Sequence, residues 1–282
     1  AVAGVLAAEL ARAGWSPLLA DGSLCQPFTS GAINDQNVVA RLPAPAGARG
    51  PAIILGAHYD ALGLRGGRLH PGADDNASGV AALLEVARLL PRRAARPPGD
   101  VILVFFGAEE VRARGSRHFV AHPPVPLERV ALMVNLDQVG RPLLDGHPLR
   151  RLLGSPRDAF GYTVSMLGRA AAEARMRHAS NATRTPVIGI PEGLLPLAGF
   201  YTDSLSFAGR VPALMLSTSI HADYHRPSDT ADRIDLGQVE RAVRLMLAIA
   251  GEPHRRFIII SRLYMRFALA GMAGAGDAGA KL

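Results

Sequence analysis

The sequence predicts an α/β fold with a mostly parallel central sheet and helices on both faces. Three observations support this prediction. Four apolar runs lack the polar alternation of half-exposed strands, segments with helical spacing separate them, and polar residues follow each run. Strands that are buried on both faces are typical of parallel sheets, whose crossover helices cover both sides. The expected architecture is therefore a three-layer α/β sandwich, with any site at the carboxyl ends of the strands.

The predicted elements follow one another in order along the chain. Strands are expected at residues 37–42, 52–57, 101–106, 130–136 and 211–217, and helices at about 2–13, 78–90, 158–177 and 236–250. Asp235 with Gln238 resembles a capping box that opens the last helix. No repeat interrupts this pattern, so we expect one catalytic domain over residues 1–282, with a disordered Gly/Ala-rich tail at 271–282.

Composition excludes several classes of protein. The 49% of hydrophobic residues excludes a disordered chain, and the net charge of +7 comes from scattered arginines rather than from the basic stripe of a nucleic-acid-binding protein. The single cysteine, Cys25, excludes an internal disulfide and a cysteine zinc cluster. Two arginines interrupt the apolar segment 257–270, which we interpret as a packing helix without stable membrane insertion. The chain begins without methionine or a visible signal peptide, so we expect a trimmed start.

Histidine and carboxylate side chains follow the predicted buried strands. They are His58 and Asp60 after the first, Glu109 and Glu110 after the second, Asp137 after the third, and His221 and His225 after the last. Because the carboxyl ends of parallel strands meet at one edge of a sheet, we expect these groups to lie together. Imidazole and carboxylate ligands without thiolate suit Zn²⁺, with Mn²⁺ or Co²⁺ as possible substitutes.

An acidic loop at residues 71–79 precedes the helix predicted at 78–90. Its neighbouring carboxylates, Asp74 and Asp75, would repel each other unless one took up a proton or a cation lay between them. The spacing of His58 and Asp60 fits a further rule, because a histidine ligand usually donates its other N–H to a carboxylate. The loop therefore supplies the acids that a metal site at the strand ends requires.

Five motifs together resemble those of the M28 family of dinuclear zinc aminopeptidases. They are His58-Tyr59-Asp60, residues 72–79, Glu109-Glu110, Asn135-Leu136-Asp137 and residues 224–230, in the order of the family and across about residues 30–240. The resemblance implies the three-layer fold of zinc-dependent exopeptidases, two Zn²⁺ per chain and peptide substrates with a free N-terminus. A secreted or periplasmic location is favoured on the same ground.

The resemblance also implies a role for each site residue. Asp74 would bridge the metals, with His58 and Asp137 on one ion, Glu110 and His225 on the other, Glu109 as general base and Asp60 orienting His58. A metal-bound hydroxide would then hydrolyse the N-terminal peptide bond. In the family the bond between the two loop acids, here Asp74-Asp75, is often cis.

Some residues depart from the family pattern, and three alternatives remain open. Gln138 stands where many relatives have Met, and Ser204 where many have His, which affects the substrate pocket rather than the ligands. One alternative is a carboxypeptidase or dipeptidase on a related scaffold, although no inserted lid is visible between Asp137 and His225. A single-zinc glutaminyl cyclase would lack His58. A non-catalytic peptide-binding domain would lack ligands or the base.

Overall fold

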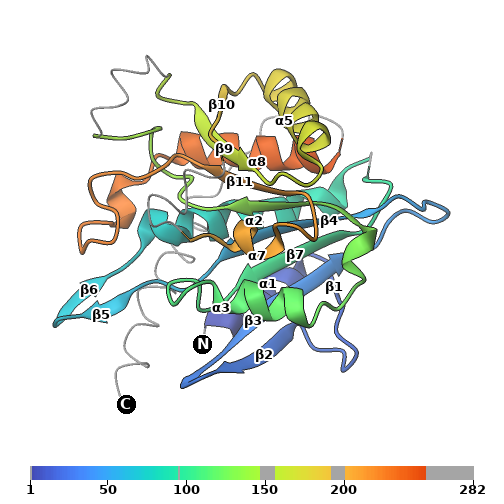
Figure 1. Ribbon diagram of the computed structural model, residues 1–282, viewed down its shortest axis with the longest axis horizontal. Coiled ribbons are helices and arrows are strands. Elements are labelled where there is room, and N and C mark those ends of the chain that lie inside the picture. Colours follow the sequence, from blue (N-terminus) through green and yellow to red (C-terminus); the bar gives the residue numbers. More distant parts are fainter. Residues whose placement is uncertain (1, 95, 147–155, 192–200, 252–282) are drawn as a thin grey trace.

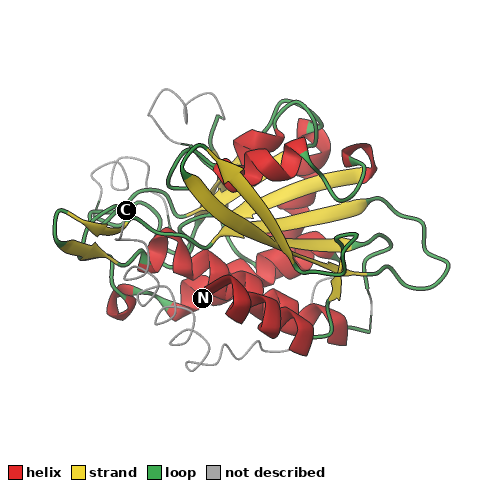
Figure 2. Cartoon of the chain, turned by 90° about the horizontal axis from the view of Figure 1, so that it is seen from below, coloured by secondary structure: helices red, strands yellow, loops and turns green. Residues whose placement is uncertain are grey.

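The computed structural model describes residues 2–94, 96–146, 156–191 and 201–251. A nine-stranded sheet runs through the described part of the chain, with helices on both faces (Figures 1 and 2). Its centre is formed by four parallel strands, in the order β7 (Val101–Phe106), β4 (Ala52–His58), β8 (Val130–Leu136) and β11 (Ala213–Ser217). The predicted α/β fold is confirmed, and all four buried strands lie where the apolar runs indicated.

The flanks of the sheet are antiparallel, so the sheet is mixed. On one side β3 (Ile33–Leu42) pairs antiparallel with β7, β1 (Ser16–Pro17) and β2 (Cys25–Ser30). On the other side β9 (Phe160–Val164) runs antiparallel to β11 and pairs in parallel with β10 (Val187–Gly189). The four parallel strands nevertheless bring their carboxyl ends to one edge, where the predicted site residues follow.

Helices cover the two faces of the sheet unequally. The larger core lies under α1 (Val2–Arg12), α2 (Gly79–Leu89), α5 (Arg169–Thr183) and α8 (Leu236–Ala250), and the smaller one under α3 (Arg114–Ala121) and α7 (Asp203–Phe207). Successive strand residues alternate between these cores: Leu55 packs into the larger and Ile54 into the smaller. Short helical turns also occur between these elements, at η2 (Leu90–Arg92), η3 (Leu127–Arg129) and η4 (Ala231–Arg233). Burial on both faces explains the apolar runs that predicted the central strands.

The helix predicted at residues 158–177 is wrong in its first half. Residues 160–164 form β9 instead, because aromatic and β-branched side chains suit a strand that pairs beside β11. The helix α5 begins only at Arg169, after Gly168 turns the backbone at φ +65°. The predicted helices at 2–13, 78–90 and 236–250 are found, and Asp235 caps α8 by accepting hydrogen bonds from the N–H groups of Gly237 and Gln238.

Two features near the strand ends were not predicted. A π-helical turn, η1 (Ala73–Ser78), holds the acidic loop directly before α2. A small hairpin of β5 (Gly63–Arg65) and β6 (Arg68–His70) lies between β4 and this turn and projects beyond the sheet (Figure 1). Among the described residues, no helix is both long and apolar enough to cross a membrane. The predictions for residues 257–270 and 271–282 fall outside the described residues.

Candidate metal centre

Three parallel strands and two loops bring the predicted site residues together. His58 is the last residue of β4, Asp137 directly follows β8, and Glu109 and Glu110 follow β7 after a two-residue turn. The loop after β11 brings His225 to the same place. The position of each of these side chains is therefore fixed by the end of a buried strand or by the loop that follows one.

Two groups of potential ligands share one carboxylate. The first group is His58, Asp75 and Asp137, and the second is Asp75, Glu110 and His225. Oδ1 of Asp75 lies 3.2 Å from Nε2 of His58, and Oδ2 lies 3.1 Å from Nε2 of His225. Nε2 of His58 is 3.6 Å from Asp137, and Nε2 of His225 is 3.2 Å from Glu110. Asp75 therefore lies between two groups of potential metal ligands.

The carboxylate that both groups share in the structure is that of Asp75, whereas the family resemblance implied Asp74. The carboxylate of Asp74 points away from both groups, accepts a hydrogen bond from the N–H of Gly140 at 2.6 Å and lies 3.3 Å from Nε2 of His221. Neighbouring residues in the η1 turn face different directions, so only one of the two acids reaches both histidines. The cis peptide bond also lies one residue later than expected, between Asp75 and Asn76.

The ring of His58 is oriented from behind by Asp60. Nδ1 of His58 lies 3.2 Å from the backbone oxygen of Asp60 and 3.5 Å from its carboxylate, so this nitrogen carries the proton and Nε2 faces the site. The same carboxylate accepts hydrogen bonds from the N–H groups of Glu109 and Glu110, at 3.0 and 3.1 Å. Asp60 therefore joins the loop after β4 to the loop that carries both glutamates.

The buried atoms of the first group fit a divalent cation. Nε2 of His58 and Oδ1 of Asp137 are buried and lack a hydrogen-bond partner among the described residues. A buried polar atom without a partner is costly, and neutral imidazole with carboxylate oxygen is a donor set that zinc accepts. The outer N–H of His58 is already held, as is usual for a metal-ligating histidine. The residues present therefore match the requirements of such an ion.

The charges of the site lead to the same conclusion. Burial opposes the charged form of His225, yet the carboxylates of Asp75 and Glu110 raise its pKa to about 10. Burial likewise opposes a proton on His58, but the negative charge of Glu109 helps to raise its pKa well above the ordinary value. Burial also raises the pKa of Glu109 and of Glu110. The carboxylates thus favour a positive charge beside them, and a bound cation would supply one.

Glu109 lies beside the ligand groups without belonging to either. Its side chain is 10% exposed, and one carboxylate oxygen is 4.0 Å from Nε2 of His58. After burial, the nearby charges of Asp203 and Asp137 add to the rise in its pKa. A nearly buried carboxylate that is not used as a ligand, but faces the ligands, is placed to take up a proton.

Two buried acids that the strand-end pattern did not assign, Asp229 and Asp203, lie near the ligand groups. Both oxygens of the Asp229 carboxylate accept from the N–H of Asp74, at 3.0 and 3.1 Å, and one also accepts from the N–H of Asp75 at 3.2 Å. Burial raises the pKa of Asp229 to about 6 and that of the fully buried Asp203 to about 7. Asp229 follows Ser228 in the motif at residues 224–230, and Asp203 directly precedes Ser204, a position that departs from the family pattern.

The backbone around the site adopts uncommon conformations. Ala108, Arg112, Gln138 and His225 have positive φ angles between 52° and 73°, and each is a site residue or lies within two residues of one. Such conformations are rare for residues other than glycine and persist where the surrounding structure fixes them. Gly72 turns at φ +63°, where a Cβ atom would collide with the backbone oxygen of Asp75. Position 72 therefore requires glycine, because the loop brings the backbone oxygen of Asp75 close to it.

Comparison with known proteins identifies the class. Residues 37–250 match the model of peptidase family M28. The uncharacterized protein YfbL of Escherichia coli (strain K12) is 33% identical over 70% of this chain and 65% of its own length, and the aminopeptidase YwaD of Bacillus subtilis (strain 168) is 28% identical over 77% and 44%. The LapA aminopeptidase of Legionella pneumophila has a similar fold, with a TM-score of 0.65 at 20% identity, over 88% of this chain and 63% of that one. This α/β chain, with its two ligand groups, belongs to peptidase family M28.

Proposed function

We propose that this protein is a dinuclear zinc aminopeptidase, which hydrolyses the N-terminal peptide bond of peptides. The observation that supports this proposal best is the sharing of Asp75 between two ligand groups, with Glu109 beside them and outside both. Membership of the M28 family and the similarity to YwaD, which is named an aminopeptidase, support it independently. The chain spans about two thirds or less of the relatives that it matches, so the activity of the whole protein is part of the proposal.

The proposed ligands follow from the two groups. His58 and Asp137 would hold one ion, Glu110 and His225 the other, and the two oxygens of Asp75 would serve both. When bound, zinc would supply Lewis acidity, which would polarise a peptide carbonyl and lower the pKa of water. Asp60 would keep the ring of His58 in the tautomer that leaves Nε2 available as a ligand.

The remaining groups would move protons and orient the substrate. Glu109 would accept a proton from the attacking water and pass it to the leaving amine.

Tyr224 stacks on the ring of His225, with ring centroids 3.8 Å apart. Burial and the surrounding carboxylates, Asp75 first among them, raise the pKa of Tyr224, so its hydroxyl keeps its proton. That hydroxyl would donate a hydrogen bond to the negative oxygen that develops during the reaction. Tyr201, more than half exposed, is the weaker candidate for this task.

A free α-amino group explains why the proposed enzyme would act from the N-terminus. A cationic amine is attracted to a site rich in carboxylates, and its neutral form is a further possible metal ligand. The prediction is that a peptide with a free N-terminus is hydrolysed and that its N-acetylated counterpart is cleaved at least about 100-fold more slowly, because acetylation removes the charge and the lone pair of the amine. Mass spectrometry of the products would also show release of one residue at a time. Rapid internal cleavage of the acetylated peptide would contradict an aminopeptidase.

Metal content provides a separate prediction. We expect the purified protein to bind up to two zinc-like ions per chain, because two ligand groups share one carboxylate. Elemental analysis after gentle dialysis would measure the ratio, and circular dichroism after chelation would show a fold that is mostly retained, since the large apolar core does not depend on the ions. Chelation should abolish hydrolysis. Saturation at a single ion would argue against the dinuclear proposal.

A further inference from the structure

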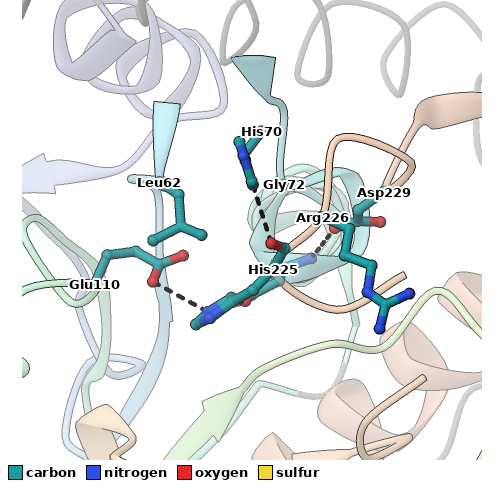
Figure 3. Close-up of a pocket in the computed structure, with 8 residues that line it drawn as sticks. Leu62, His70, Gly72, Glu110, His225, Arg226 and Asp229 are labelled. Atoms are coloured by element: carbon teal, nitrogen blue, oxygen red, sulfur yellow. Dashed lines mark hydrogen bonds and ion pairs between the residues drawn. The ribbon is translucent and has the colours of Figure 1, made fainter. Parts of the chain in front are cut away.

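The β5–β6 hairpin is attached directly to the candidate metal centre. Leu62 precedes the hairpin, His70 ends it and Gly72 follows it, and all three line a pocket together with Asp75 and His225 (Figure 3). Nδ1 of His70 lies 3.0 Å from the backbone oxygen of His225. The hairpin is thus fixed at its base to the loop that carries one of the proposed ligands, and it projects from there beyond the sheet (Figure 1).

The pairing register decides which side chains of the hairpin face the pocket. The pairs are Gly63 with His70, Leu64 with Leu69 and Arg65 with Arg68. Paired residues lie on the same face of a hairpin, and successive residues alternate between faces. Arg65 and Arg68 therefore share the face of His70, the strand residue of the hairpin that lines the pocket. The leucine pair lies on the opposite face.

The turn keeps the two arginines opposite each other. Gly66 and Gly67 both have positive φ angles, +56° and +74°, as in the two-residue turn that fits the twist of paired strands. Like charges directly opposite each other in a hairpin are destabilising. Both arginines are exposed, Nε of Arg65 donates a hydrogen bond to the backbone oxygen of Leu62 at 3.3 Å, and among the described residues neither arginine forms an ion pair with a carboxylate. Two arginines that are paired across a hairpin and have no carboxylate partner are suited to an anion supplied from outside the chain.

The position of the pair indicates where on a peptide that anion would be. Arg68 is two residues from His70, which is about 7 Å along a strand at about 3.3 Å per residue. An extended peptide rises by a similar distance per residue. A carboxylate about two or three residues beyond the scissile bond would therefore lie within reach of the pair. Arginine binds carboxylates with two parallel N–H donors, which makes it well suited to this anion.

We propose that Arg65 and Arg68 form a recognition site for a carboxylate on the leaving side of the substrate. The carboxylate would be the C-terminus of a short peptide. This inference rests on the proposed peptidase function and adds a substrate class to it: short peptides with a free C-terminus. The site lies outside both ligand groups, so it would affect the choice of substrate and not the chemical step.

The test compares two substrates that differ only in the carboxylate. The zinc-loaded enzyme is assayed with a tripeptide carrying a free C-terminus and with the same tripeptide as its C-terminal amide. We expect wild type to prefer the free acid, and Arg65→Gln with Arg68→Gln to lower the ratio of the two kcat/KM values by about 3- to 10-fold, as two exposed charge pairs would. High salt should reduce the wild-type preference by screening the charges. Arg177→Gln, an exposed arginine on α5, is the matched control and should keep the wild-type ratio.

A binding measurement separates this inference from the proposed function. Calorimetry with the Glu109→Gln protein would give the affinity for both tripeptides without turnover, and the double arginine change should lower the affinity for the free acid relative to the amide. An unchanged ratio in both kinetics and binding would overturn the inference. If wild type hydrolysed neither peptide, the proposed function would fail, while the binding ratio would still decide whether the hairpin recognises a carboxylate.

Discussion

Replacing Glu109 with glutamine is expected to lower kcat by about 10²–10⁴-fold, the usual contribution of a general acid–base group. Glutamine has nearly the same shape as glutamate but cannot accept the proton that the proposed reaction releases. Because Glu109 lies outside both ligand groups, the variant should retain its metal ions and its substrate affinity. The loss should therefore appear in kcat with little change in KM. Steady-state kinetics, together with elemental analysis of the same preparation, would measure both effects.

The neighbouring residue supplies the control for this experiment. Glu110 is 3.2 Å from His225 and belongs to the second ligand group, so Glu110→Gln should reduce metal content as well as activity. The wild-type pH profile of kcat should also contain an ionisation that the Glu109→Gln variant lacks. Full activity in Glu109→Gln, or loss of metal from it, would exclude Glu109 as the base.

The second large effect is expected from Asp75. Asp75→Asn removes the negative charge from the residue that the two ligand groups share, and an amide offers one oxygen where the carboxylate offers two. We expect metal content to fall below one ion per chain and kcat/KM to fall by more than about 100-fold, since changes to the partners of metal ligands alone cost about 10–100-fold. Elemental analysis and hydrolysis of an aminoacyl amide would measure the two losses together.

Asp74 provides the matched comparison, because it is the acid that the sequence favoured. Asp74→Asn keeps an oxygen to accept the N–H of Gly140 and should retain both ions and most of the activity. Circular dichroism of the two variants would show that each is folded. If Asp74→Asn lost metal while Asp75→Asn retained it, the assignment of the shared carboxylate to Asp75 would be wrong.

Strong local patterns made the central fold predictable. The strands β4, β7, β8 and β11 are buried on both faces, and this burial leaves uninterrupted apolar runs in the sequence. The edge strands lack this signal. The strand β9 has only five residues and is only partly apolar, so its sequence was also compatible with the start of the following helix. Pairing with β11, a contact between residues about fifty positions apart, decided its conformation.

The chemical types of the site residues were likewise determined by the sequence. Histidines and acids at the ends of parallel strands must meet at one edge, so the order of the residues along the chain was enough to group His58, Glu110 and Asp137. The choice of His225 over His221 came from the resemblance to the M28 family. Only the tertiary structure distinguished Asp74 from Asp75. Both have the same side chain and adjacent positions, and the path of the η1 turn, held by Asp229 from a distant loop, sets which one faces the histidines. The face of the β5–β6 hairpin that carries Arg65 and Arg68 was also decided by strand pairing, because a shift of one residue in register would place them on the face opposite His70.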